Sequence, residues 1–353
     1  MDTDLINKAK QVLIVPMLVS VLGISGTTGA TAQSETMVTV RISTSIDTLD
    51  GLLPKIGQDL GIMREHGLEL DFRAWPGGAT MLADVLEYKA DVTHVSAGLV
   101  FSAISRGAPL IVLSSNYDID YSIVASSNIP LPHFYSPYPE NIRDFEGKRI
   151  GVVARGGATE RLVSKVLSDA GLDPISSVEY VSVGTGVGAA GAIMNNQVDF
   201  LVVIPPSDQL IDSDAAIPLV DNKSVKSDVY GTDFLFSVFS ANAAFVEQSP
   251  QTAEAFCSAL TETYAFVVDE ENRSVVLSYL ENDMNLPPAL AERMWDEFGM
   301  NFNIKLEHDR WEKMRDQVAV LPDWDTATFE PCIRATDIDI AVPTRKASAH
   351  GNL

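Results

Sequence analysis

The sequence predicts an α/β protein made of two doubly wound lobes, and three observations support this. Apolar strands alternate with amphipathic helices, a pattern typical of parallel sheets with helices on both faces. The stretch LDFRAWPGGATMLADVLEYKADVTHV (70–95) aligns without gaps with VEYVSVGTGVGAAGAIMNNQVDFLVV (178–203), 108 residues further along the chain. With 353 residues, the chain is long enough for two packed lobes rather than one core.

Each copy of this duplication contains a strand, a turn rich in small residues, a short helix and the start of a second strand. The matched positions are Leu70 with Val178, Phe72 with Tyr180, Gly78 with Gly186, Ala83 with Gly191, Leu86 with Met194, Asp91 with Asp199, and Val95 with Val203. Upstream and with small gaps, VRISTSIDTLDGLLPKIGQDLG lies over RIGVVARGGATERLVSKVLSDAG. Both of these segments predict a strand, a turn, a helix and a closing glycine in the left-handed conformation.

Two such lobes are expected to face each other across a cleft. In open parallel sheets the ligand lies beyond the carboxyl ends of the strands, where the loops of both lobes meet. A binding site is therefore expected in the turns that follow the strands.

The N-terminal segment has the three parts of a secretory signal peptide. Lys8 and Lys10 precede the apolar run VLIVPMLVSVLGI, and Ala30-Thr31-Ala32 forms an A-x-A cleavage site. The apolar run is shorter than the roughly 20 residues that a transmembrane helix needs. No cysteine near the cleavage site offers a lipid anchor. We therefore expect cleavage after residue 32 and a soluble periplasmic protein.

The formal net charge of −23 argues against nucleic acid and anionic lipid as partners. It says little about a buried site, because salt screens surface charge beyond about 8 Å. The two cysteines, Cys257 and Cys332, leave two interpretations open. They are either buried hydrophobic residues or, in an oxidising compartment, a disulfide that ties the C-terminal tail to the helix around residue 257.

Gly186, Gly188 and Gly191 have the G-x-G-x-x-G spacing of a dinucleotide-binding turn. The duplication weakens that interpretation, because these glycines occupy the second strand-turn-helix of their lobe, whereas the fingerprint belongs to the first. The acid that would bind the ribose, Asp208, also lies past the end of its strand, beyond Pro205 and Pro206. No cofactor is predicted.

Four segments together resemble one family: VRISTS, GLELDFRAWPGGATMLADVLEYKADVTHVSAG, FEGKRIGVVARGGATERLVSKVLSDAGL and IMNNQVDFLVVIPPSDQ. In order and spacing they are similar to the periplasmic solute-binding proteins of ABC importers in the nitrate, aliphatic sulfonate, taurine and thiamine-precursor (NMT1-like) group. The resemblance covers residues 38 to about 300. It implies a type II periplasmic-binding fold with two crossover strands, which closes on a small molecule and delivers it to an inner-membrane permease.

The resemblance also implies where the lobes begin and end. The first crossover is expected near residues 121–127 and the second near 233–242. The expected divisions are a signal peptide at 1–32, lobe 1 at 36–124, lobe 2 at 125–235, a second and helical part of lobe 1 at 236–330, and a C-terminal tail at 331–353. Ser249-Pro250 predicts a helix start, with serine as N-cap and proline at the first position.

The strongest candidate binding turn is GVVARGGATERL. Here Arg155 and the glycines Gly156 and Gly157 precede a helix that begins near Ala158 or Thr159. Exposed N–H groups at a helix start bind anions, and glycine lets a ligand approach the backbone closely. The alternative is that Arg155 pairs with a surface acid such as Glu160.

Further candidates lie at the other strand ends. Ser43, Thr44 and Ser45 end one strand, and Ser96, Ala97 and Gly98 end another before a helix, although both sets also suit ordinary N-capping. Trp75, Asn116, Tyr117 and Tyr121 are candidates to contact a planar ligand, or else pack structurally. Pro206 and Asp208 occupy the matching strand end of lobe 2, where Ile204 stands in place of the acid that many relatives carry before proline.

The search for catalytic chemistry finds little. The five histidines (His66, His94, His133, His308 and His350) show no metal-ligand spacing, and no G-x-S-x-G motif occurs. The sequence therefore predicts a monomeric, non-enzymatic import protein that binds a sulfonate-like or carboxylate-like anion. The acids Asp47, Asp118 and Asp120 keep a thiamine-precursor-like pyrimidine or an amine open as ligands, and an exported enzyme or sensor domain on the same fold is the alternative function.

Overall fold

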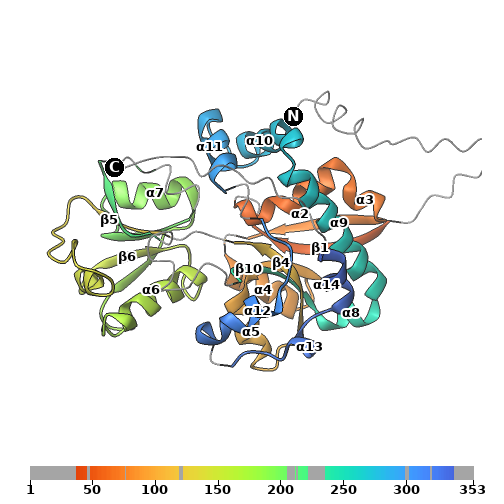
Figure 1. Ribbon diagram of the computed structural model, residues 1–353, viewed down its shortest axis with the longest axis horizontal. Coiled ribbons are helices and arrows are strands. Elements are labelled where there is room, and N and C mark those ends of the chain that lie inside the picture. Colours follow the sequence, from red (N-terminus) through yellow and green to blue (C-terminus); the bar gives the residue numbers. More distant parts are fainter. Residues whose placement is uncertain are drawn as a thin grey trace, which may run out of the picture.

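A computed structural model describes residues 37–45, 48–75, 77–118, 122–204, 211, 214–221, 235–298, 302–318 and 320–337, which form two lobes (Figure 1). The strands of lobe 1 are β1 (Val38–Thr44), β2 (Leu68–Ala74), β3 (Val92–Ser96), β4 (Leu110–Tyr117) and β10 (Ser237–Asn242). The strands of lobe 2 are β5 (Ser122–Ser126), β6 (Arg149–Val152), β7 (Glu179–Ser182), β8 (Phe200–Val203) and β9 (Ala216–Asp221). The predicted two-lobed α/β fold is confirmed.

The two sheets have the same internal plan. Their orders are β2-β1-β3-β10-β4 and β7-β6-β8-β5-β9. The first three strands of each sheet are parallel, and the fourth is antiparallel to both of its neighbours. In both sheets this fourth strand, β10 or β5, is the first one formed after the chain crosses from the other lobe. The chain therefore crosses between the lobes after β4 and again after β9, and the segments expected as crossovers, near 121–127 and 233–242, contain the strands β5 and β10 that follow.

An arginine–aspartate pair recurs at equivalent places in the two lobes, 50 residues apart in each. The Arg41 backbone N–H donates to Asp91 Oδ2 at 2.9 Å, and the Arg149 backbone N–H donates to Asp199 Oδ2 at 2.9 Å. The side-chain Nε atoms donate to the same oxygens at 3.0 and 3.2 Å. The repeat detected in the sequence is therefore a repeat of contacts as well.

Helices cover both faces of each sheet. In lobe 1 the first are α2 (Leu49–Leu60), α3 (Ile62–Glu65), α4 (Gly78–Leu86) and α5 (Ala97–Ile104). Lobe 2 contains η1 (Glu140–Phe145), α6 (Ala158–Asp169) and α7 (Gly186–Met194). The predicted closing glycines, Gly61 after α2 and Gly171 after α6, have φ of 83° and 75°, which is the left-handed conformation that favours glycine.

After β10 the chain continues as helices. These are α8 (Ala243–Gln248), α9 (Pro250–Val268), η3 (Glu270–Asn272), α10 (Arg273–Asn282), α11 (Pro288–Phe298), α12 (His308–Lys313), η4 (Met314–Gln317), α13 (Trp324–Ala327) and α14 (Glu330–Thr336). Helix α9 begins at Pro250 as the sequence predicts, although the Ser249 side chain makes no capping hydrogen bond. A disulfide joins Cys257 of α9 to Cys332 of α14, so residues 331–336 of the expected tail are part of a helix attached to lobe 1.

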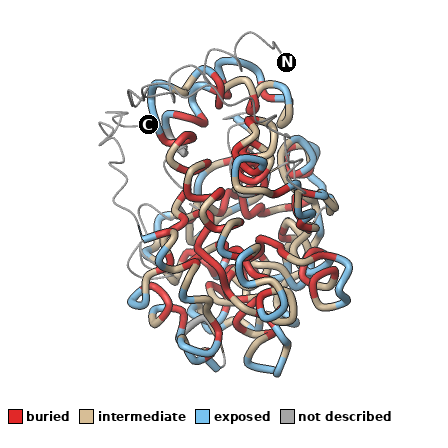
Figure 2. The backbone as a smooth tube through the Cα atoms, turned by 90° about the vertical axis from the view of Figure 1, so that its right-hand side faces the viewer, coloured by how far each residue is buried: buried red, intermediate tan, exposed pale blue. Residues whose placement is uncertain are grey.

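Each lobe has its own apolar interior. The helix α9 and the strands β1 and β10 contribute to the largest cluster of buried side chains, and lobe 2 has separate clusters on the two sides of its sheet. Figure 2 shows the buried segments running through the interior of the molecule while exposed segments lie at its periphery. The expected boundary at residue 124 lies within β5, and the expected boundary at residue 330 lies at the start of α14.

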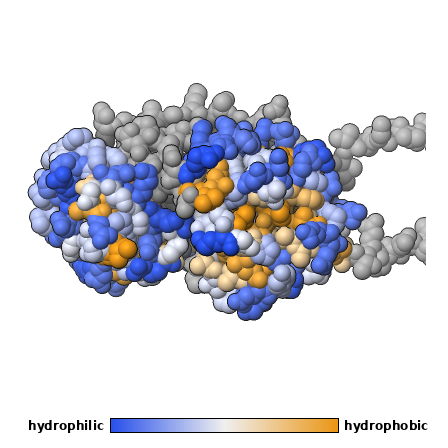
Figure 3. Space-filling view, turned by 90° about the horizontal axis from the view of Figure 1, so that it is seen from below, coloured by the Kyte–Doolittle hydropathy of each residue, from blue (hydrophilic) through white to orange (hydrophobic). Residues whose placement is uncertain are grey.

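The space-filling view shows two bodies of unequal size (Figure 3). Much of the visible surface is hydrophilic, in keeping with the net charge of −23, and the apolar surface on this side gathers on the larger body. Within the described part of the chain, no helix has the length and apolar character needed to span a bilayer. The predicted signal peptide (1–32) and the residues from 338 onward lie outside the described residues.

Candidate functional site

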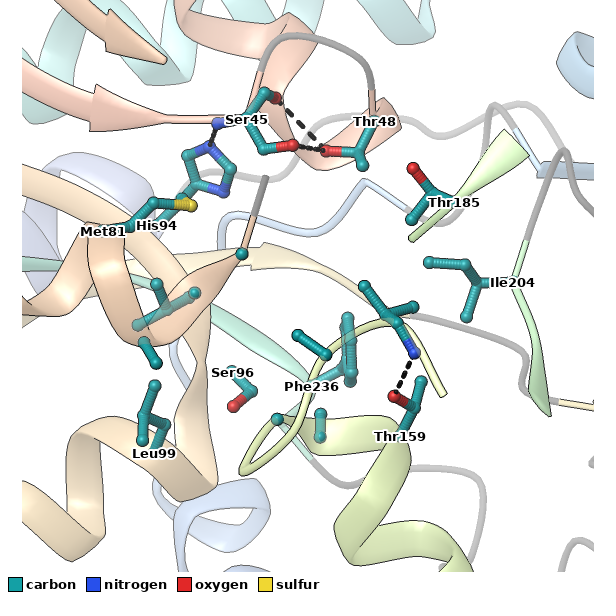
Figure 4. A pocket seen from close by; sticks show the side chains of 18 of the residues that line it. Ser45, Thr48, Met81, His94, Ser96, Leu99, Thr159, Thr185, Ile204 and Phe236 are labelled. Atoms are coloured by element: carbon teal, nitrogen blue, oxygen red, sulfur yellow. Dashed lines mark hydrogen bonds between the residues drawn. The ribbon is translucent and has the colours of Figure 1, made fainter. Parts of the chain in front are cut away.

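A pocket lies between the two lobes, at the carboxyl ends of their parallel strands. It encloses about 870 Å³, open solvent included. Figure 4 shows side chains from both lobes turned toward this space. The described residues that line it are Ser45, Thr48, Leu49, Gly77, Gly78, Ala79, Met81, His94, Val95, Ser96, Leu99, Tyr117 and Phe236 from lobe 1, and Val153, Ala154, Gly157, Ala158, Thr159, Thr185 and Ile204 from lobe 2.

Five helices begin at this pocket. The N-cap residues of α2, α4 and α5 in lobe 1 and of α6 and α7 in lobe 2 all line it, and none of them caps its own helix through a side-chain hydrogen bond. A helix N-terminus carries a partial positive charge of about half an elementary charge, from N–H groups that lack partners within the helix. The N-cap residues are Thr48, Gly77, Ser96, Gly157 and Thr185.

Two of these helix starts meet where the lobes approach each other. A Cβ atom added to Gly77 would lie 3.5 Å from the Cβ of Ala154 in the opposite lobe. Glycine at position 77 therefore keeps the mouth of the pocket narrow without closing it.

The walls of the pocket are largely apolar. Leu49, Met81 and Leu99 contribute from lobe 1, and Ile204 from lobe 2. No lysine, arginine, aspartate or glutamate occurs among the described residues that line the pocket. Helix termini and hydroxyl groups therefore provide the polar contacts there, and the walls suit the carbon skeleton of an organic molecule.

His94 lines the pocket and is buried, with 1% exposure. Its Nε2 atom lies 2.7 Å from Thr44 Oγ1 and accepts a hydrogen bond from the Ser45 backbone N–H at 3.4 Å. Thr48 Oγ1 donates to the carbonyl oxygen of Ser45 at 3.2 Å (Figure 4). These bonds hold the turn after β1 against β3.

Arg155, the cation expected to bind an anion, does not line the pocket. Its Nε donates to Glu160 Oε2 at 2.8 Å and its Nη2 to Oε1 at 3.2 Å, with 60% of the side chain exposed. The Gly156 N–H donates to the same carboxylate at 2.6 Å. This is the alternative that the sequence left open. Of the predicted turn, Gly157, Ala158 and Thr159 line the pocket, whereas Arg155 and Gly156 face away.

Arg161, which sequence reasoning missed, lies at the junction of the lobes instead. From α6 its Nη2 donates to Ser96 Oγ of lobe 1 at 2.7 Å, and its Nη1 donates to the Gly156 carbonyl oxygen at 3.3 Å. The sequence placed both Arg155 and Arg161 beside the same helix start. Glu160 holds Arg155 at the surface, whereas Arg161 is oriented by its bonds to Gly156 and Ser96.

Trp75 is a structural residue in this arrangement and does not line the pocket. Its indole N–H donates to Asp84 Oδ2 at 2.7 Å, and Arg73 Nε donates to the same oxygen at 2.8 Å. Asp84 is 4% exposed. Burial by itself raises the pKa of Asp84, but the hydrogen bonds from Arg73 and Trp75 prevail and hold that pKa below its ordinary value.

Asp118 pairs with Arg310 of lobe 1 and does not line the pocket, and the other predicted residues divide into three groups. Ser45, Ser96 and Tyr117 line the pocket. Ser43, Thr44, Ala97, Gly98 and Asn116 are buried behind it, and Asn116 Nδ2 donates to Ser237 Oγ at 3.4 Å. Pro206, Asp208, Tyr121, Asp47 and Asp120 lie outside the described residues.

Sequence reasoning also missed Thr48, Gly77, Gly78, His94, Thr185 and Phe236 as pocket residues. A signal existed for Gly78, which aligns with Gly186 in the duplication. His94 stands two positions before the predicted Ser96 in the same strand. The glycine motif itself forms the start of α7, and a Cβ on Gly188 would come within 3.1 Å of the Val183 carbonyl oxygen. That motif therefore serves close packing at a helix start that faces the pocket.

A family model described as NMT1/THI5 like matches residues 56–273, more than half of the chain. The chain belongs to this family. A comparison with curated protein sequences finds no match. Residues 56–273 include both crossovers and four of the five helix starts at the pocket.

Solved structures similar to this family member have the periplasmic-binding-protein fold. A protein from Bordetella bronchiseptica RB50 is 22% identical, with a TM-score of 0.71 over 84% of this chain and 96% of that one. The alkanesulfonate-binding protein SsuA from Xanthomonas axonopodis pv. citri, bound to MOPS, is 17% identical, with a TM-score of 0.62 over 82% and 98%. The desulfurization enzyme DSZB is 16% identical, with a TM-score of 0.57 over 84% and 98%. At these identities the likeness establishes the fold.

Proposed function

We propose that this protein is the periplasmic substrate-binding component of an ABC importer and that it captures a small organic anion, a sulfonate or a carboxylate, between its lobes. The observation that carries the proposal is the convergence of five helix N-termini, from both lobes, on one pocket with apolar walls. Helix N-termini stabilise an anion, and apolar walls take up a carbon skeleton.

The proposal assigns direct ligand contacts to the turns at the pocket. These are Ser45 and Thr48, the backbone of Gly77 and Gly78, Ser96, the turn of Gly157, Ala158 and Thr159, and Thr185. Because contacts come from both lobes, the ligand favours the closed arrangement over the open one. Closure would occur about the two crossovers, and the closed complex would be the form that the permease recognises.

Binding of defined anions to the purified protein tests the proposal. Isothermal titration with ethanesulfonate, taurine, MOPS, short carboxylates and an aminopyrimidine is expected to show saturable binding of at least one sulfonate or carboxylate. X-ray scattering should show compaction with the same compound. Binding of the aminopyrimidine alone would favour the thiamine-precursor alternative, and absence of binding to every anion would contradict the proposal.

An enzyme on the same fold is the second candidate, supported by His94 in the pocket and by the likeness to DSZB. Mass spectrometry of the titrated compound after prolonged incubation separates the two candidates. A binding protein returns the compound unchanged. A product that disappears with His94→Ala would favour the enzyme.

A further inference from the structure

A hydrogen bond between two side chains of the described residues joins the two lobes beside the pocket. Among hydrogen bonds that connect two described residues, only the bond from Arg161 Nη2 to Ser96 Oγ, 2.7 Å long, links a side chain of lobe 2 to lobe 1. Ser96 is the N-cap of α5 and lines the pocket, and Arg161 lies in the first turns of α6. The bond therefore crosses from one lobe to the other at the edge of the ligand site.

The surroundings of Arg161 fit its guanidinium closely. A Cβ atom added to Gly98, the second residue of α5, would lie 3.6 Å from Arg161 Nη2 and 3.7 Å from its Nε. The guanidinium thus rests against the first turn of α5. The second donor group, Nη1, bonds the Gly156 carbonyl oxygen of its own lobe at 3.3 Å, which orients the side chain toward lobe 1.

The electrostatics of this position depend on what occupies the pocket. The guanidinium lies beside the N-terminal ends of α5 and α6, which both carry partial positive charge. An anion bound between the same helix ends attracts the guanidinium as well, so it strengthens the lobe-to-lobe contact.

We propose that Arg161 is a positioning residue that couples anion binding to closure, with Ser96 as its acceptor across the cleft. This inference rests on the proposed function and deepens it. The bond forms only when the lobes approach, so it slows ligand release more than it speeds ligand capture.

The test compares Arg161→Gln with Arg155→Gln. Arg155→Gln removes the same charge six residues away, but among the described residues Arg155 pairs with Glu160 at the surface and donates no hydrogen bond to lobe 1. The probe is the sulfonate or carboxylate that binds the wild type most tightly, followed by stopped flow. Arg161→Gln is expected to raise the dissociation rate about tenfold with an association rate unchanged within about twofold, since a hydrogen bond to a charged group is lost. Arg155→Gln should leave both rates unchanged.

Two further variants separate coupling from general destabilisation. Ser96→Ala should also raise the dissociation rate, through loss of this bond and of its own ligand contact. The double variant Ser96→Ala/Arg161→Gln should raise that rate by less than the product of the two single effects, because the lobe-to-lobe bond is lost only once. Arg161→Lys, which keeps the charge, should recover part of the slow release. Equal dissociation rates for Arg161→Gln and Arg155→Gln, or full additivity in the double variant, would overturn the inference.

A measurement without ligand keeps this inference separate from the proposed function. With one fluorophore on each lobe, the distance distribution of Arg161→Gln is expected to shift toward longer separations than that of Arg155→Gln. If the wild type binds no anion, the proposed function fails, while this comparison still decides whether Arg161 holds the lobes together. Identical distance distributions would then refute the role of Arg161.

Discussion

At the scale of single residues, Arg149 and Asp199 show how each of the duplicated lobes is stabilised internally. Asp199 accepts hydrogen bonds from the backbone and the side chain of Arg149, at 2.9 and 3.2 Å on one oxygen and 2.8 Å on the other. The hydrogen bond from the Arg149 side chain holds the pKa of Asp199 below its ordinary value, although burial acts in the opposite direction. The carboxylate therefore stabilises lobe 2 in its ionised form.

The stability of lobe 2 should depend on this ionisation. Because the folded-state pKa of Asp199 is lowered, its contribution is present above the unfolded pKa of about 3.9 and is lost as pH falls through the folded value. Asp199→Asn should lower the free energy of unfolding by about 1 kcal/mol at pH 7, since Arg149 is partly exposed and screened by solvent.

Urea unfolding at pH 7 and pH 3 checks this expectation. The difference in unfolding free energy between wild type and Asp199→Asn should shrink at the lower pH. Glu146→Gln, an exposed acid of the same lobe, serves as the control and should change stability little at either pH. A difference that stays constant with pH would contradict the assigned role of the ionised carboxylate.

The sequence pattern matched Asp91 with Asp199, although it did not predict that each pairs with an arginine. The alignment of Asp91 with Asp199 follows from a repeat in the sequence, because a repeat preserves local contacts. That Arg155 stays at the surface depends on its pairing with the Glu160 side chain. The Glu160 side chain reaches back to the turn in one of several rotamers, and the spacing of residues along the chain does not indicate which rotamer it adopts.

At the scale of helices and strands, the disulfide between Cys257 and Cys332 ties α14 to the buried helix α9. Both cysteines are fully buried, and 75 residues separate them in the sequence. The sequence suggested this disulfide but could not establish it, because the buried face of the helix that contains Cys257 suits a free thiol equally well. The short helix α14 also gives little periodic signal, since it spans only seven residues.

Removing the disulfide should loosen α14 more than the rest of the fold. Cys257→Ala/Cys332→Ala is expected to lower the free energy of unfolding by about 2 to 4 kcal/mol, because the crosslink restricts the unfolded chain. Thermal unfolding of the variant, and of the wild type with and without reductant, measures this change. Reductant should lower the midpoint of the wild type and leave that of the variant unaltered. An identical midpoint for both proteins under oxidising conditions would count against the disulfide.

At the scale of the whole molecule, the pocket depends on how closely the lobes approach. Gly77 of lobe 1 faces Ala154 of lobe 2 across the mouth, with room for a Cβ atom at ordinary contact distance. A larger side chain at position 77 would separate the lobes or fill the pocket. The two-lobed plan and the presence of a pocket at the strand ends were predictable, because both follow from the repeated strand-turn-helix order.

A graded pair of substitutions tests this geometry. Gly77→Ala should bind the preferred anion within about threefold of the wild type, whereas Gly77→Leu should weaken binding at least tenfold and abolish the compaction seen by scattering. Titration calorimetry supplies the affinities, and circular dichroism checks that both variants fold. Wild-type affinity in Gly77→Leu would show that the lobes do not need to meet at this point.

The position of β10 between β3 and β4 has a consequence for the order in which the molecule can assemble. Every strand of lobe 2 lies between residues 122 and 221, so that sheet can be completed as soon as this stretch has emerged during synthesis. The sheet of lobe 1 must wait for residues 237–242 to enter between β3 and β4, and until then these two strands each expose an edge that could pair with another chain. A nascent chain that pauses before residue 237 would thus carry a complete sheet in lobe 2 and an incomplete, aggregation-prone sheet in lobe 1.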